Sequence, residues 1–344
     1  MTIKDIARES GYAVGTVSKV LNNHPDVSEK ARTKIMEVVN KYHFRLNNNA
    51  KHLRQQANSG IAIIVKGSGN RLFADMVEAL QKLIKEKEYT CLIYYINELD
   101  DEVEQALQVC RERQPSGILF LGGNLKNFTE EFQAVDVPCV MVTNSAEGLN
   151  FNTLSSVSID DTMAAKTAIE YLISLGHEKI GILGGGLKDA DRMKGSSPMK
   201  SRYDGCMDAF AEKKLTFDEN RQFEAAFFTM EGGYWAMKRL MEKMPDITAV
   251  FSMSDVTAIG AIRAIKDQGL RVPEDVSVVG FDGIEMGQFM VPRLTTIKQP
   301  GTEMVHRCVE ILLECILENR PAVNEKIPFC LVKGESTAKT PRRS

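Results

Sequence analysis

The residues Thr2–Asn22, TIKDIARESGYAVGTVSKVLN, carry apolar side chains at the spacing of two short helices. The apolar positions of the first helix are Ile3, Ile6 and Ala7. After Gly11, the second run has an apolar side made of Val14, Val17, Val20 and Leu21. Two short helices joined by a tight glycine-containing turn form a helix-turn-helix, whose second helix enters the major groove of DNA. The polar residues of the second run, which suit phosphates and base edges, are Thr16, Ser18, Lys19 and Asn22.

The composition is that of a globular protein, with 43% hydrophobic and 26% charged residues in a chain of 344 residues. This length allows two or three domains. No apolar run reaches the ~20 residues of a transmembrane helix, and the N-terminus has no apolar signal core, so we expect a cytoplasmic, nucleoid-associated protein. Seven cysteines occur singly without a C-x-x-C pair, which indicates reduced core thiols.

Charge is spread unevenly along the chain. Residues 1–58 hold 10 Lys and Arg against 5 Asp and Glu, a net charge of +5, whereas the whole chain carries −3. The remaining residues therefore carry a net charge of −8. A basic end on an acidic body indicates that only the first domain meets a polyanion, although a chance surface imbalance is the alternative.

Several long motifs resemble the lactose/galactose-repressor (LacI/GalR) family, in that family's order. TVSKVLN is followed by VSEKARTKIMEVVNKYHFRLN in the N-terminal region. Later segments of the same kind are SLGHEKIGILGG, SDVTAIGAIRAIKDQGLRVPEDVSVVGFD and LTTIKQP. The resemblance covers essentially the whole chain. It implies a transcriptional repressor that binds double-stranded operator DNA as a homodimer, under the control of a small polar effector such as a sugar.

The resemblance also implies which residues read the operator. The positions that set base choice in the family correspond to Val14, Gly15 and Lys19. Val14 offers only apolar contact, Gly15 allows close backbone approach, and Lys19 can donate to guanine. Ala13 stands where the family often has a capping serine, and together with Gly15 it indicates a weakly preformed helix, with neutral variation at both positions as the alternative. A two-fold dimer would read a pseudo-palindromic site.

A third helix, roughly Glu29 to Tyr42, is expected to cover the first two, and residues 47–54 form a linker. In the family the linker folds into a hinge helix whose leucine is wedged into the minor groove. The matching residue is Leu53, supported by Ala50, Lys51 and Arg54. Such a wedge kinks DNA, while the alternative is that Leu53 packs on the core. Candidate phosphate contacts, or ordinary surface charges, are Lys4, Arg8, Arg32, Lys51 and Arg54.

From Gly60 onward, short apolar runs alternate with helical stretches, which predicts parallel sheets built from βαβ units. The first series of strands is Ile61–Val65, Thr90–Tyr95, Gly117–Leu121 and Val137–Val142. The second is Ile180–Leu183, Gln222–Phe228, Ala249–Met253 and Ser277–Gly280. Alternation of this kind agrees with the type I periplasmic-binding-protein fold of the resembled family, an α/β core of two doubly wound subdomains.

The expected domains follow from these patterns. They are a helix-turn-helix domain at residues 1–46, a hinge helix and linker at 47–59, and an effector-binding and dimerisation core at 60–344. Within the core, an N-subdomain is expected at about 60–158 plus 292–322, and a C-subdomain at about 159–291 plus 323–337. The segment at 188–200 is expected to be a mobile surface loop or a lid.

The ligand in this fold lies between the halves, beyond the carboxyl ends of the strands. The effector residues carried over by motif are Phe73, Asn144, Asp160, Arg202, Phe228, Asp255 and Asp282, with Asn70 and Arg71 near Phe73. Asp accepts hydroxyl hydrogens, Arg donates in a fork and aromatic faces stack on a ligand. Instead of contacting a ligand, Phe73 could pack in the core. The Asp282–Gly283 sequence could likewise form an ordinary turn.

A solute-binding protein and an enzyme are the two alternative functions. A solute-binding protein would need an export signal and would not need a helix-turn-helix. An enzyme is disfavoured because His177, in GHEKIG, belongs to no H-E-x-x-H motif, the remaining histidines lack metal-ligand spacing, and no G-x-S-x-G is present. We expect no cofactor, no metal and no catalytic residues.

Overall fold

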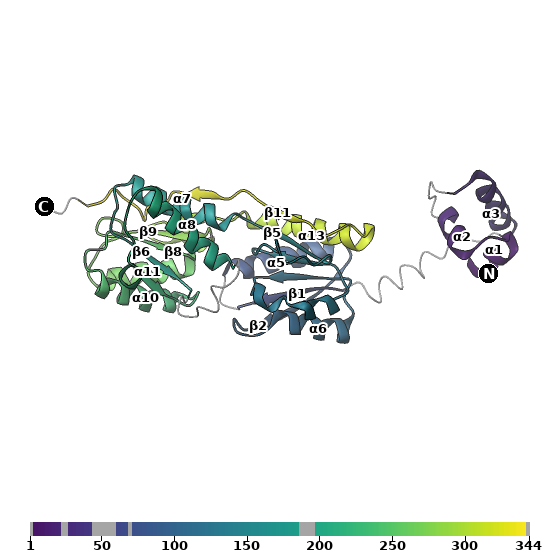
Figure 1. Ribbon diagram of the computed structural model, residues 1–344, viewed down its shortest axis with the longest axis horizontal. Helices are drawn as coiled ribbons and strands as arrows, with labels where there is room; N and C mark the ends of the chain where they lie inside the picture. The colour runs from purple at the N-terminus through teal and green to yellow at the C-terminus, as the bar shows by residue number, and fades with distance from the viewer. Residues whose placement is uncertain (1–2, 22–26, 43–59, 68–70, 186–196, 342–344) are drawn as a thin grey trace. The chain divides into compact units, whose positions relative to one another are not determined.

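The computed structural model of the protein describes residues 3–21, 27–42, 60–67, 71–185 and 197–341. Contacts divide the chain into two compact units, residues 1–58 and 59–344. The three N-terminal helices belong to the first unit and the sheets belong to the second (Figure 1). The expected hinge at 47–59 lies outside the described residues. In the described part of the chain, no helix is long and apolar enough to cross a membrane.

The first unit is built from α1 (Ile3–Ser10), α2 (Val14–Leu21) and α3 (Glu29–Lys41). Gly11, with φ +73°, ends α1, and its N–H donates to the carbonyl oxygen of Ala7. This left-handed position favours glycine and makes the tight turn between the helices. The small core consists of Ile6, Ala7, Val17, Val20, Ile35 and Val39. Tyr42, at the end of the expected third helix, is exposed.

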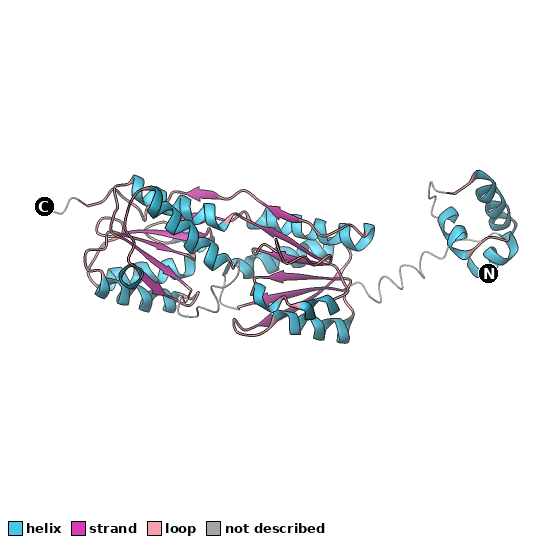
Figure 2. Cartoon of the chain, viewed as in Figure 1, coloured by secondary structure: helices cyan, strands magenta, loops and turns pink. Residues whose placement is uncertain are grey.

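The second unit contains two six-stranded sheets with helices on both faces (Figure 2). The first sheet has the order β11-β5-β4-β3-β1-β2. Its strands are β1 (Gly60–Lys66), β2 (Thr90–Ile96), β3 (Gly117–Leu121), β4 (Cys139–Val142), β5 (Leu154–Ser158) and β11 (Asn324–Lys326). Its helices are α5 (Arg71–Glu86), α6 (Glu102–Arg113) and α13 (Gly301–Glu318), with short 3-10 turns at Leu125–Asn127 and Glu130–Ala134.

The second sheet has the order β12-β10-β9-β8-β6-β7. Its strands are β6 (Ile180–Gly184), β7 (Phe223–Ala225), β8 (Ala249–Ser252), β9 (Ser277–Asp282), β10 (Thr295–Lys298) and β12 (Cys330–Val332). Its helices are α7 (Asp161–Ser174), α8 (Pro198–Glu212), α9 (Glu219–Gln222), α10 (Met230–Lys243), α11 (Asp255–Asp267) and α12 (Met286–Phe289). Ladders in both sheets are parallel except that of β12, which runs antiparallel to β10.

The chain crosses between the halves differently from the expected subdomain boundaries. Thr295–Lys298 was expected in the first subdomain but pairs with β9 in the second sheet. Asn324–Lys326 was expected in the second subdomain but pairs with β5 in the first sheet. The chain therefore crosses after β5, after β10 and after β11, and α13 returns beside the first sheet (Figure 1). These strands are short and have few apolar residues, so their sequence pattern does not indicate which sheet they join.

Strand β5 was also missed, because its sequence LSSVS is mostly polar. Its buried serines bind the returning segment: Ser156 Oγ donates to Asn324 Oδ1 at 2.6 Å, and Ser155 Oγ accepts from the Val323 N–H at 3.1 Å. The seven cysteines are free thiols. Cys139, Cys206 and Cys308 are buried as expected, but Cys330 is exposed.

Candidate effector cavity and DNA-binding helices

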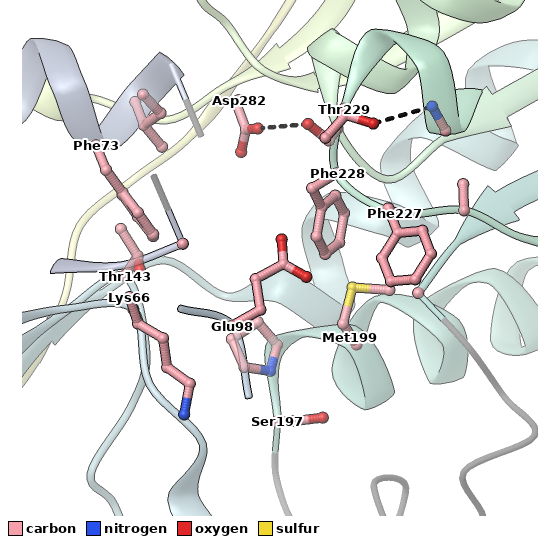
Figure 3. A pocket seen from close by; sticks show the side chains of 18 of the residues that line it. Lys66, Phe73, Glu98, Thr143, Ser197, Met199, Phe227, Phe228, Thr229 and Asp282 are labelled. Carbon is pink, nitrogen blue, oxygen red and sulfur yellow. Dashed lines mark hydrogen bonds between the residues drawn. The ribbon is translucent and has the colours of Figure 1, made fainter. Parts of the chain in front are cut away.

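A cavity of about 730 Å³ lies between the two sheets of the second unit, at the carboxyl ends of their strands (Figure 3). Lys66 is the last residue of β1, Thr143 follows β4, and Asp282 is the last residue of β9. All three line the cavity. Parallel strands leave such a crevice because their connecting helices diverge at this edge.

Five of the seven expected effector residues line this cavity, namely Phe73, Asn144, Arg202, Phe228 and Asp282. They come from different elements: Phe73 from the first turn of α5, Arg202 from α8 and Phe228 from the loop before α10. Figure 3 shows Phe73 facing the cavity from the first half and Phe228 from the second. The structure thus gathers residues that lie far apart in the sequence.

Arg202 is the cation of the second half. Its Nε donates to Asp161 Oδ1 at 2.7 Å, and one terminal nitrogen donates to the carbonyl oxygen of Met253 at 2.7 Å. Its guanidinium also lies 3.6 Å from the ring centroid of Phe281. A planar donor held on three sides in this way has a fixed orientation in the cavity wall.

Asp282 is the neighbouring acceptor, and only 4% of its surface is exposed. Its carboxylate accepts from Gln299 Nε2 at 2.9 Å and from Ser254 Oγ at 3.2 Å. Burial raises the pKa of Asp282 to about 6, although the nearby Arg202 guanidinium opposes this rise. The residue also adopts φ 114°, an unusual backbone conformation for a side chain other than glycine. Backbone strain of this kind is typical of binding sites.

Two expected effector residues have other positions. Asp255 does not line the cavity, because its buried carboxylate is occupied by the N–H groups of Gly283 and Ile284 and by Thr296 Oγ1. It anchors the turn after β9, and burial raises its pKa well above the usual value. Asp160 caps α7 by accepting from the Met163 N–H at 3.0 Å and is half-buried. The sequence pattern SIDD did not distinguish Asp160 from Asp161, the residue that pairs with Arg202.

The first half contributes a polar wall. Asn144 Nδ2 donates to the carbonyl oxygen of Gly123 at 2.7 Å, while its Oδ1 accepts from Thr143 Oγ1 at 3.4 Å. Phe73 belongs to the hydrophobic core and also lines the cavity. Its ring packs against Gly122, where an added Cβ would lie 2.9 Å from the Phe73 ring.

A buried ion pair, missed in the sequence, supports the same wall. Lys66 Nζ donates to the Glu102 carboxylate and to the carbonyl oxygen of Asp100. Glu102 also accepts from the N–H of Asn124 and from Asn127 Nδ2. It therefore joins strand β1 to helix α6 and to the loop after β3. Lys and Glu are common surface residues, so no sequence signal identified this pair.

The DNA-binding residues are described in part. Gly15 and Lys19 are exposed on α2, and Thr16 is half-exposed. Val14 and Ser18 lie on the same helix. Asn22, Lys51, Leu53, Arg54 and Asn70 lie outside the described residues.

Comparisons with known proteins agree with both units. Residues 2–47 match the family model of bacterial regulatory proteins of the lacI family, and residues 169–337 match a periplasmic binding protein-like domain. The HTH-type transcriptional regulator MalR of Clostridium butyricum is 35% identical over 324 residues, covering 92% of this chain and 93% of the relative. The chain belongs to the LacI family of transcriptional regulators. The ribose operon repressor of Haemophilus influenzae is 31% identical, with 92% of each chain covered.

Solved structures of LacI-family regulators share the fold. The transcriptional regulator CelR in its cellobiose complex matches with a TM-score of 0.71 and 23% identity, covering 98% of this chain and 99% of that one. The lac repressor dimer bound to operator and an anti-inducer matches with a TM-score of 0.70 and 23% identity, with the same coverage. The relatives are DNA-binding transcriptional regulators and not enzymes, so this LacI-family member is a regulator too.

Proposed function

We propose that this LacI-family regulator is a repressor that binds an inverted-repeat operator as a homodimer and senses a sugar or sugar derivative in its cavity. The observation that supports an effector is that two buried charged side chains, Arg202 and Asp282, both line the cavity. A buried donor and a buried acceptor that face one ligand space match the paired hydroxyls of a sugar. The names of the ribose repressor and of the CelR–cellobiose complex agree with this class of ligand.

The operator would be read by α2 and by the hinge. Lys19 supplies the hydrogen-bond donor to a base, while Val14 and Gly15 supply apolar contact and close approach. Thr16, Ser18 and Asn22 add polar contacts, and Lys51, Leu53 and Arg54 form the minor-groove part of the interface. Because the regulator acts on operator DNA, we place it in the cytoplasm.

The effector would act by changing how the two halves of the core lie against each other. Three crossings of the chain connect the halves, so a ligand held by Arg202 on one side and Asn144 on the other favours one relative arrangement. Effector and operator would then each prefer one arrangement, which couples their affinities.

The test combines two measurements on the full chain. Calorimetric titration with sugars identifies the ligand, and an electrophoretic mobility shift on a selected inverted repeat measures operator affinity with and without that ligand. We expect Arg202→Lys to weaken ligand binding at least about tenfold, because a single ammonium replaces a fork of donors. Equal affinity for inverted-repeat and scrambled duplexes under every condition would contradict the proposal.

Base readout has its own test. Lys19→Ala should relax the base preference at one symmetric pair of operator positions, because a good contact to a base edge discriminates by about 1–3 kcal/mol. Lys34→Ala is the matched control, since Lys34 is an exposed lysine on α3, outside the recognition helix. Selection of sites from random DNA measures the preference, and an unchanged preference would refute the role of Lys19.

A further inference from the structure

We infer that the effector is a neutral saccharide of at least two rings, and that its second ring stacks on Phe227 and Trp235 at the outer end of the cavity. This inference rests on the proposed function, since it concerns the same cavity. The observation behind it is that the cavity continues past the Arg202–Asp282 pair along helix α10.

The cavity has two ends of different character. At the inner end the polar residues are buried, among them Arg202, Ser254 and Asp282. At the outer end Phe227 is 73% exposed and Trp235 is 49% exposed, yet both line the same cavity. Figure 3 shows Phe227 beside Met199, further from Asp282 than Phe228 is in this view. Large aromatic rings left exposed inside a ligand cavity are stacking surfaces that a ligand can cover.

The length of the cavity exceeds what a single ring needs. Glu231, Trp235 and Arg239 line it from successive turns of α10, a span of about 12 Å at 1.5 Å per residue. The half-buried Phe228 and the exposed Trp235 both line the cavity, so two aromatic positions are available to a ligand. A monosaccharide bound at Arg202 and Asp282 would leave the outer position empty.

The helix that carries Trp235 is held firmly. Gly233 of α10 and Gly260 of α11 allow the two helices to touch: an added Cβ would lie 2.1 Å from Thr257 O at the first glycine and 1.9 Å from Met230 O at the second. Arg239 ties the same helix to β7, since its Nε donates to Glu224 Oε2 at 3.0 Å. A stacking residue on a rigid element is preorganised for its ligand.

The charges of the described lining favour a neutral ligand. Each lining cation is paired with a carboxylate: Lys66 with Glu102, Arg202 with Asp161 and Arg239 with Glu224. Two lining carboxylates, Glu98 and Glu231, have no hydrogen-bond or ion-pair partner within the described residues. Figure 3 shows the Glu98 carboxylate pointing into the cavity. Carboxylates accept hydroxyl hydrogens but repel phosphate and uronate groups.

The experiment is calorimetric titration of the full chain with maltose, cellobiose, lactose, sucrose, trehalose and melibiose. Their component monosaccharides, glucose 6-phosphate and adenosine complete the panel. We expect one neutral disaccharide to bind at least about tenfold more tightly than its own monosaccharides. Trp235→Ala should weaken that disaccharide about tenfold and change monosaccharide affinity less than about twofold. Met230→Ala is the matched control, because Met230 is exposed on α10 but does not line the cavity.

Each other outcome overturns the inference. If a monosaccharide binds as tightly as every disaccharide, no second ring is recognised. If Trp235→Ala weakens both ligands equally, the side chain serves packing rather than stacking. If glucose 6-phosphate or adenosine binds and no neutral saccharide does, the inference fails while the proposal of a sugar derivative as effector stands. If the protein binds its operator but none of the compounds in the panel, the proposal of a sugar effector is wrong as well.

Discussion

At the scale of single residues, the cavity wall depends on carboxylates that are hydrogen-bonded to other groups of the protein. Asp161 serves Arg202, Asp255 serves the turn after β9, and Asp282 alone of the three lines the cavity. Neighbouring carboxylates in a sequence can therefore have opposite roles. Asp160 is a half-buried helix cap, whereas Asp161 is buried against a guanidinium.

We predict that Asp161→Asn lowers the free energy of unfolding by about 3 kcal/mol, because it leaves a buried guanidinium without its charged partner. Asp160→Asn is the matched control and should cost less than about 0.5 kcal/mol, since asparagine caps helices as well as aspartate does. Chemical denaturation of both variants measures the difference. Similar losses for the two variants would contradict the assignment.

We predict that Asp282→Asn changes how stability depends on pH. The pKa of Asp282 is raised by burial from 3.8 to about 6, so ionising it costs more in the folded state than in the unfolded state. Wild-type stability should therefore fall as pH rises from about 4 to about 6, and the variant lacks this loss. Relative to the wild type, the free energy of unfolding of the variant should increase by roughly 1–2 kcal/mol between pH 5 and pH 8. If the difference in denaturation midpoint between wild type and variant is the same at both pH values, the prediction is wrong.

At the scale of elements, helix α10, which lines the effector cavity, and the recognition helix α2 differ in rigidity. Helix α10 is locked to α11 by two glycines and to β7 by Arg239. Helix α2 begins after Ala13 and contains Gly15, around which an added Cβ would meet no atom within 4 Å. The helix that holds the proposed second sugar ring is therefore rigid, whereas the recognition helix has a residue that lowers helix stability.

We predict that Gly15→Ala stabilises α2 by about 0.5–1 kcal/mol and weakens operator binding. Alanine removes the entropic cost of glycine, but its methyl group blocks close approach to the DNA. Hydrogen exchange of the α2 amides in the full chain measures the first effect, and a mobility shift on the selected operator measures the second. Unchanged amide protection would contradict the expected gain in helix stability.

At the scale of the whole molecule, an apolar patch on the second half supports the proposed homodimer. Phe289 and Val291 are each 80% exposed, and Met286 is 44% exposed one turn earlier. Exposed apolar residues that occur together mark interfaces, whereas single ones such as Leu317 are ordinary. The patch lies on α12 and the segment after it, and none of its residues lines the effector cavity.

We predict that Phe289→Asp shifts the protein from dimer to monomer and lowers operator affinity, because a buried charge in an apolar interface is unfavourable. Leu317→Asp, an equivalent change at an isolated exposed leucine, should leave the dimer intact. Sedimentation equilibrium at several protein concentrations measures both. If Phe289→Asp still forms a dimer, the dimer interface lies elsewhere on the molecule.

The sequence alone determined most elements that bury a continuous or periodic apolar pattern, although helix α13, which buries Met304, Cys308 and Leu312, was not predicted. The helix-turn-helix, the alternating strands such as β1 and β3, and the helices between them follow from local spacing, since burial requires one apolar face at a defined period. The candidate effector residues Arg202 and Asp282 were predicted differently, from the resemblance to a family over a long ordered stretch.

Only the tertiary structure decided which sheet each short C-terminal strand joins, which aspartate meets Arg202, and that Trp235 and Glu98 share one cavity. These outcomes depend on contacts between residues far apart in the chain, and polar or single side chains leave no periodic signal of such contacts. Local patterns specify elements because they report on burial. Packing specifies the site, because a ligand meets the ends of many elements at once.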